Sequence, residues 1–250
     1  MRLVVLGSGG WIPTGRRETC CFAVRRDSEV LIVDAGTGLR RLLERTDVLE
    51  GATAVNIVLS HFHLDHVVGL GYLPALRIPK VTVIWGPGAG LYGVSTREIL
   101  ERLLVSPFFT AGLASIASDV LDVTEGSVAC GGFGLLARRQ DRHSEPTLAL
   151  RVEDAVTYCT DTAFDLENAR FASGSALLLH EAWHAGAETD DEIHSAAGEA
   201  GRIAREAAVG RLVLVHVNPL LDSEETLSAA ASLEFAESSV GNDLDSFELG

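Results

Sequence analysis

Four side chains of the metal-binding type stand close together directly after an apolar run. His61, His63, Asp65 and His66 follow residues 55–59, whose composition is typical of a buried strand. In extended backbone, His61 and His63 project to the same side, while the chain beyond the strand is free to fold into a loop. Imidazole and carboxylate ligands without thiolate suit zinc, manganese or iron. We therefore predict a metal site here rather than a group of surface histidines.

Length and composition limit what kind of protein can carry such a site. The chain has 250 residues, of which 47% are hydrophobic and 22% charged, and its formal net charge is −15. This length permits a substantial core. No linker, repeat or low-complexity segment divides the chain, so residues 1–250 are predicted to form a single domain. The acidic balance repels phosphate backbones at long range, which disfavours nucleic acid as a partner without a local basic face.

The cysteines and the apolar runs bear on the compartment. Cys20, Cys21, Cys130 and Cys159 form no Cys-x-x-Cys pair, and we predict buried, reduced thiols in a cytoplasmic protein. The few apolar residues before Gly7 are too short for a signal peptide, and no apolar run approaches the length of a membrane span. We expect no membrane partner, and a homodimer is left open.

The remaining apolar runs predict a strand-rich fold with helices between the strands. Predicted helices cover residues 39–45, 95–104, 164–171, 193–208 and 227–235. Strands are predicted at residues 3–6, 19–24, 30–33, 55–59, 81–85, 121–123, 128–130, 133–137, 148–152, 156–159, 177–179 and 212–215. This pattern suits an α+β fold, a four-layer αββα sandwich in which two mixed sheets pack face to face and helices cover the outer faces.

The motif His61-x-His63-x-Asp65-His66 after a buried strand resembles the signature of the metallo-β-lactamase-fold hydrolases. The resemblance implies ligands for two divalent ions. The first ion would be bound by His61, His63 and His143, the second by Asp65, His66 and His216, and Asp161 would bind both. Thr160 stands where the family has a glycine. A core histidine held by hydrogen bonds is the alternative for His143 or His216 taken singly. The ordered set at strand ends, where a rigid sheet can hold loops in place, favours ligands.

The glycine-rich segment at residues 7–10 follows the first predicted strand. It does not fit a dinucleotide-binding loop, because Ile12 stands where a third glycine is needed and Pro13 blocks the helix. We expect instead a turn that passes close to the active site. In the family, a glycine-rich loop followed by Pro-Thr and Arg lies near the metals, so Arg16 and Arg17 are candidates for binding an anionic substrate. Solvated arginines are the equal alternative.

Asp34 ends the strand at residues 30–33 and precedes a glycine turn. Such an aspartate could cap the following helix, or it could support a ligand histidine from behind. The family has an Asp-x-Gly turn at this point that supports the metal loop. We therefore predict that Asp34 holds one of the histidines.

Two further segments narrow the resemblance. His180-Glu181-Ala182 matches an element typical of ribonuclease Z and its relatives, with Trp183 in place of a threonine. His194 begins a segment similar to the one whose histidine serves as the family's proton donor. We predict His194 as general acid, Glu181 as the group that holds its charged form, and Asp65 as both a ligand and an orienting group for the attacking hydroxide. His180 and His184 receive no role.

The motifs together predict a metal-dependent hydrolase of the phosphodiesterase-like branch. We expect two divalent ions, with zinc as the first choice and manganese or iron as alternatives. These ions would make hydroxide from water for attack on a small or cyclic phosphodiester. A ribonuclease Z-type cut at transfer-RNA 3′ ends is the alternative, disfavoured by the charge of −15. Hydrolysis of an ester or lactone is another. A non-catalytic metal-binding scaffold fits least, because a structural site needs no proton donor.

Overall fold

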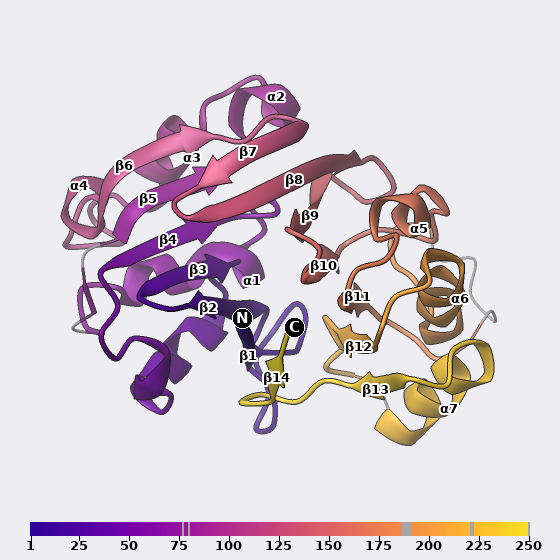
Figure 1. Ribbon diagram of the computed structural model, residues 1–250. Coiled ribbons are helices and arrows are strands. Elements are labelled where there is room, and N and C mark those ends of the chain that lie inside the picture. The colour runs from indigo at the N-terminus through magenta and orange to yellow at the C-terminus, as the bar shows by residue number, and fades with distance from the viewer. Residues whose placement is uncertain (77, 80, 187–191, 221–222, 250) are drawn as a thin grey trace.

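Strands form two sheets that face each other in the computed structural model, which describes residues 1–76, 78–79, 81–186, 192–220 and 223–249. Within these residues each sheet has seven strands, in the order β14-β1-β2-β3-β4-β5-β6 in the first and β13-β12-β11-β10-β9-β8-β7 in the second. Figure 1 shows β1 to β6 of the first sheet in indigo to pink, with β14 in yellow beside β1, and α5, α6 and α7 along the outer side of the second sheet.

The bounds of the elements follow the apolar runs. The first sheet consists of β1 (Arg2–Gly7), β2 (Cys21–Arg26), β3 (Glu29–Val33), β4 (Ala54–Val58), β5 (Val81–Gly86), β6 (Ala117–Asp122) and β14 (Ser246–Glu248). The second consists of β7 (Gly126–Cys130), β8 (Phe133–Gln140), β9 (Thr147–Val152), β10 (Val156–Cys159), β11 (Leu177–Glu181), β12 (Leu212–Val215) and β13 (Ser238–Val240). The helices are α1 (Leu64–Val67), α2 (Gly88–Tyr92), α3 (Thr96–Leu103), α4 (Leu113–Ile116), α5 (Glu167–Phe171), α6 (Ala197–Ala207) and α7 (Glu224–Glu234), with 3-10 turns η1 (Thr37–Leu43), η2 (Thr46–Val48) and η3 (Val68–Tyr72).

Both faces are buried in the central strands of each sheet, such as β3, β4, β11 and β12, which explains why these strands appear as unbroken apolar runs. Because successive side chains of a strand point to opposite faces, Leu3 of β1 packs between the sheets and Val4 packs on the outer face. Along β12, Val213 likewise packs between the sheets, whereas Leu214 faces the helices. The predicted four-layer αββα sandwich is therefore confirmed.

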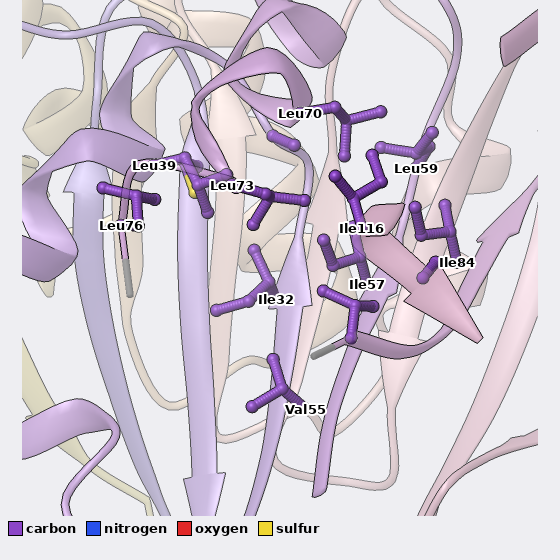
Figure 2. Packing of buried hydrophobic residues seen from close by; sticks show 14 of the residues in the cluster. Ile32, Leu39, Val55, Ile57, Leu59, Leu70, Leu73, Leu76, Ile84 and Ile116 are labelled. Carbon is purple, nitrogen blue, oxygen red and sulfur yellow. The ribbon is translucent and has the colours of Figure 1, made fainter. Parts of the chain in front are cut away.

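Helical segments cover the outer faces. On the first sheet, Leu39, Leu70 and Leu73 from η1, η3 and the turn after η3 lie over Ile32 and Ile57 of the central strands (Figure 2). On the second sheet, the small-residue face of α6 packs over β11 and β12, which lets the helix approach closely. Each sheet is thus held rigidly from both sides.

Strand direction brings the candidate residues to one edge. Strands β3 to β6 run parallel, and so do β10 to β13. Two antiparallel pairings in succession give β1 the direction of β3 and give β8 the direction of β10. In each sheet, the loops that carry the chemistry-bearing residues therefore leave at the same edge, after the carboxyl ends of these strands.

A few elements differ from the prediction. The helix predicted at residues 39–45 is instead the 3-10 turn η1, Thr37–Leu43, and the backbone N–H of Gly38 in its first turn is bonded to Thr19 O at 3.1 Å. Strand β11 extends two residues further than predicted, and the short polar edge strands β13 and β14 were missed. The four cysteines are buried and unpaired, as predicted. Among the described residues, none of the helices has the length and apolarity needed to cross a bilayer.

Candidate metal centre

Ligand-type atoms from both sheets meet at the carboxyl edge. In each of two groups these atoms lie within 4.8 Å of one another, and the groups are His61, His63, His143 and Asp161, and Asp65, His66 and His216. They are the seven residues that the sequence singled out. His61, His66, Asp161 and His216 are buried, whereas His63, Asp65 and His143 are partly exposed.

Asp161 lies between the two groups. Its Oδ2 atom is 3.0 Å from Nε2 of His66 and 3.6 Å from Nε2 of His61. Its Oδ1 atom is 3.3 Å from Nε2 of His216 and 3.7 Å from Nε2 of His143. Each carboxylate oxygen thus faces one imidazole of each group, which is the arrangement that a shared ligand requires.

Backbone conformation turns these side chains out of the sheets. Asp34, Asp161 and His216 have φ angles of 56°, 47° and 50°, in the left-handed region that few non-glycine residues adopt. Asp34 and His216 directly follow β3 and β12, and Asp161 follows β10 by two residues. Strained conformations of this kind concentrate at functional sites. Here the left-handed conformation turns the chain just after a buried strand, so that a polar side chain faces the site at the edge of the sheet.

The glycine-rich first loop lies against the second group, in agreement with the expectation that it passes close to the site. A Cβ atom on Gly10 would come within 2.6 Å of the His216 ring, so only glycine leaves room for this imidazole. The next backbone N–H, of Trp11, donates to Oδ2 of Asp65 at 2.7 Å. The loop therefore positions one histidine and one carboxylate of the second group.

Asp34 holds His66 from behind, as the sequence predicted. Its Oδ2 atom accepts hydrogen bonds from Nδ1 of His66 at 2.7 Å, from the Ser60 hydroxyl at 2.8 Å and from the Tyr158 hydroxyl at 3.0 Å. The other oxygen accepts from the Ser60 backbone N–H at 2.7 Å. Tyr158 reaches across from the second sheet, so this carboxylate joins the sheets directly beneath the site.

Ser60 and Tyr158 were missed by the sequence analysis. The polar residue at the end of an apolar strand was a usable signal for Ser60. For Tyr158 the sequence offers no signal, because a tyrosine in a buried strand is ordinarily a core residue.

Three imidazoles have one nitrogen fixed and the other directed at the cluster. Nδ1 of His66 donates to Asp34, and Nδ1 of His143 donates to the Ile193 carbonyl at 3.0 Å. The Ser60 hydroxyl gives its proton to Asp34, so it accepts from Nδ1 of His61 at 3.0 Å. Partners of this kind set the tautomer of a metal-binding histidine.

The residues fit a divalent cation. Nε2 of His61 is buried without a hydrogen-bond partner among the described residues, and the nearest oxygen of Asp161 is 3.6 Å away. A buried polar atom left unpaired is destabilising. Burial, followed by the neighbouring His66, lowers the pKa of His61 well below its usual value, and burial likewise lowers the pKa of His63 and His143. Neutral imidazoles have the free lone pair that a metal needs.

The charge balance points the same way. Burial alone would lower the pKa of His66, but the carboxylates of Asp65, Asp161 and Asp34 raise it well above its ordinary value. Burial would raise the pKa of Asp65, yet His66 and His216 hold it below its usual range. The concentrated negative charge of these carboxylates attracts a cation, and nitrogen and oxygen donors without thiolate suit a divalent metal.

His194 and Glu181 form a separate pair at the rim. Nδ1 of His194 lies 2.7 Å from Oε2 of Glu181, whose other oxygen accepts from the Thr162 backbone N–H. The Trp183 ring stacks on His194, with centroids 4.4 Å apart and planes 17° apart. Asp161, His194 and His216 also offer ligand atoms within 4.8 Å of one another. His194 is therefore placed either to donate a proton or to serve as an additional ligand.

The two arginines are held away from the cluster. Arg17 is buried and bonds to the Ser8 hydroxyl at 2.5 Å and to the Gly241 carbonyl, and it pairs with Glu224 at 2.9 Å. The side chain of Arg16 is 77% exposed and pairs with the same glutamate at 2.8 Å. Their predicted contact with an anionic substrate stays a prediction.

His180 and His184 lie outside the three groups of ligand atoms. His180 is buried on β11 on the face toward α6, beside Leu214 of β12. Its Nδ1 atom donates to the Glu181 carbonyl at 3.0 Å, and burial lowers its pKa from 6.5 to about 4. His180 is thus a packed core histidine.

This burial predicts a pH-dependent stability. Below pH 6.5 the unfolded chain takes up a proton on His180 that the folded chain does not accept until about pH 4. The free energy of unfolding therefore falls as the pH drops through this window, by about 2 kcal/mol from this residue at pH 5. Urea unfolding of wild type and His180→Leu at pH 7 and pH 5 should show a loss that is smaller in the variant by that amount. An equal loss in both proteins would contradict the assignment.

The fold and this site define the class of protein. The family model described as "Beta-lactamase superfamily domain" matches residues 30–217, and the chain belongs to that family. The match contains all seven ligand-type residues. The predicted class, a metal-dependent hydrolase of the metallo-β-lactamase fold, is confirmed.

The chain is also similar to particular proteins, in sequence or in fold. A ribonuclease Z of Haloferax volcanii is 25% identical, with 100% of this chain and 95% of the relative covered. The metallo-β-lactamase-fold protein YhfI of Bacillus subtilis has the same fold, with a TM-score of 0.81, 20% identity and 99% of both chains covered. A structure described as a new diphosphatase from the PhnP family gives a TM-score of 0.75 at 18% identity, covering 100% of this chain and 98% of that one.

Proposed function

We propose that the chain is a phosphodiesterase that uses two divalent ions, zinc in the first place, to hydrolyse a small or cyclic phosphodiester. The single observation that supports this best is the position of Asp161 between two groups of imidazole and carboxylate ligands. A lone structural ion needs four ligands and no shared carboxylate. Two ions held side by side suit an in-line displacement at phosphorus, in which charge develops on both the entering and the leaving oxygen.

In this proposal, each residue of the centre has a defined role. His61, His63 and His143 would hold one ion, Asp65, His66 and His216 the other, and Asp161 both. When bound, such ions supply Lewis acidity, which lowers the pKa of water to about 7 and neutralises charge on the phosphoryl oxygens. Asp65 is fixed by the Trp11 N–H and so can orient an attacking water.

A leaving alkoxide needs a proton, and His194 is our candidate donor. Glu181 accepts from Nδ1 at 2.7 Å, which stabilises the protonated ring and directs Nε2 as the donor. Trp183 stacks on the ring and limits its rotation. A proton donor beside the ligands is what a hydrolase needs and a scaffold does not.

Ribonuclease Z activity is the second candidate, because a ribonuclease Z aligns with the whole length of this chain. Against it stands the net charge of −15, which repels transfer RNA unless a basic surface offsets it. A small substrate carries less charge and is repelled less. We therefore place the small phosphodiester first.

The test is a hydrolysis panel on protein of known metal content. Purified chain, stripped and reloaded with zinc or manganese, would be assayed with bis(p-nitrophenyl) phosphate, a 2′,3′-cyclic nucleotide, a precursor transfer RNA, p-nitrophenyl butyrate and a lactone. We expect two ions per chain and turnover of the small phosphodiesters. Turnover of the transfer RNA alone would establish the second candidate. Turnover of ester or lactone alone, or no turnover by metal-replete protein, would refute the phosphodiesterase.

A further inference from the structure

Three large apolar side chains are exposed on the two segments that the Trp11–Asp65 hydrogen bond joins. Trp11, Ile12 and Leu64 are exposed to 60%, 49% and 64%. Each is tied to the second group of ligands. The backbone N–H of Trp11 donates to Asp65, Ile12 is the next residue, and Leu64 directly precedes Asp65 in the chain. We call Trp11, Ile12 and Leu64 the apolar lip.

The conformation of Trp11 is unfavourable for its side chain. Its φ angle is 61°, in the left-handed region that glycine and asparagine adopt readily and bulky residues avoid. The other left-handed residues at this edge, Asp34, Asp161 and His216, all direct polar atoms to the site. Trp11 gains little burial in return for its strain, so the folded core does not explain the choice of tryptophan. Strain of this kind is a reason to look for a function.

The backbone beneath the indole is fixed relative to the metal ligands. The Trp11 N–H is bonded to Asp65 at 2.7 Å, and the Ile12 N–H is bonded to the Gly10 carbonyl at 2.8 Å in a tight turn. Gly10 in turn lies against the His216 ring. A ligand group seated on the exposed indole would therefore lie at a set distance from whatever the second group of ligands holds.

We propose that the apolar lip binds a planar aromatic group on the part of the substrate that stays attached to phosphorus. The inference rests on the proposed phosphodiesterase function and adds its substrate class, an ester of phosphate with an aryl or nucleoside group. An indole offers a large rigid face at small entropic cost, and stacking of aromatic rings is worth about three- to tenfold in affinity. Leu64 and Ile12 supply the adjoining apolar surface.

Substrates with the same leaving group test the proposal. Methyl, phenyl and thymidine 5′ esters of p-nitrophenyl phosphate all release p-nitrophenol and differ only in the retained group. For zinc-loaded wild type we expect a higher kcat/KM for the phenyl and thymidine esters than for the methyl ester. Trp11→Ala should lower this preference about three- to tenfold, and Trp11→Phe should restore most of it. If Trp11→Ala lowers the relative kcat/KM equally for the phenyl and thymidine esters, the apolar lip binds any planar ring. If it lowers only that of the thymidine ester, the lip binds a nucleobase.

The matched control is Phe108→Ala, because Phe108 is 80% exposed and lies far along the chain from the ligands. The Asp65 contact uses the Trp11 backbone, so Trp11→Ala should keep its metal content and its melting temperature. A preference that is unchanged in Trp11→Ala while wild type hydrolyses all three esters would overturn the proposal and leave the phosphodiesterase intact. The same holds if Phe108→Ala lowers the preference equally.

A binding measurement separates the inference from the proposed function. Phenylphosphonate and methylphosphonate are not hydrolysed, and calorimetry on the zinc-loaded protein gives the ratio of their affinities. We expect wild type to favour phenylphosphonate and Trp11→Ala to lose about three- to tenfold of that ratio. Absence of turnover of all three esters by wild type would refute the proposed phosphodiesterase function. An equal affinity ratio in wild type and Trp11→Ala would refute binding of the aromatic group by the apolar lip.

Discussion

Asp161→Asn is expected to abolish most of the activity and to release metal from both groups. The change keeps the volume of the side chain and tolerates the φ angle of 47° at this position, so folding should survive. It removes the charge that faces His66 and His216 from one side and His61 and His143 from the other. We expect kcat/KM to fall about a hundred- to a thousandfold, the usual contribution of one preorganised electrostatic group at an active site.

Elemental analysis of the purified variant, with a turnover assay beside it, measures both effects. Asp154→Asn is the matched control, because the Asp154 side chain is 93% exposed and pairs only with Arg151 on the surface. It should keep its metal and its rate. An Asp161→Asn protein that kept two ions per chain and wild-type turnover would show that the carboxylate is not shared.

His194→Gln is expected to slow the reaction in a way that depends on the leaving group. An alkoxide leaves only with a proton, whereas p-nitrophenoxide leaves without one. For thymidylyl-thymidine we expect kcat to fall about a hundred- to ten-thousandfold, the usual contribution of a general acid. For thymidine 5′-p-nitrophenyl phosphate kcat should change little. Glu181→Gln should show the same pattern to a smaller degree, because Glu181 acts through His194.

Metal content decides between the two roles open to His194, which lies within 4.8 Å of ligand atoms of Asp161 and His216. A proton donor can be removed without loss of metal, whereas an additional ligand cannot. The neighbouring His184, which donates to the Gly186 carbonyl at 2.7 Å, provides the control variant His184→Gln. An equal loss with both substrates, accompanied by loss of metal, would assign His194 as a ligand.

Most of the fold could be predicted from the sequence because both faces of the central strands are buried. Continuous apolar runs such as that of β12, Leu212–Val215, are visible without any tertiary information. The short strand β14, Ser246–Glu248, has no such run and exists only because β1 lies beside it. The turn η1 has the apolar spacing of a helix, and this spacing alone does not distinguish the observed 3-10 turn from an α-helix.

The candidate ligands were found in sequence because they are of unusual type and stand at strand ends. Residues that act through their backbone or their small size gave no such signal. Gly10 matters because a Cβ would strike His216, and Trp11 contacts Asp65 through its N–H. Both facts depend on which segments the fold brings together, and no local pattern records them. The contacts of the Arg17 side chain with the Gly241 carbonyl and with Glu224 likewise join segments far apart in the chain.

Each group of ligands draws on both sheets. His61 and Asp65 come from the loop after β4, whereas Asp161 and His216 follow β10 and β12 of the opposite sheet. No fragment confined to one sheet therefore contains all the ligand-type residues of either group. During synthesis on the ribosome, neither group could close before residue 161 had emerged, and the second group would have to wait for residue 216. A chain truncated before residue 216 is therefore expected to lack the second group even where the first group is complete.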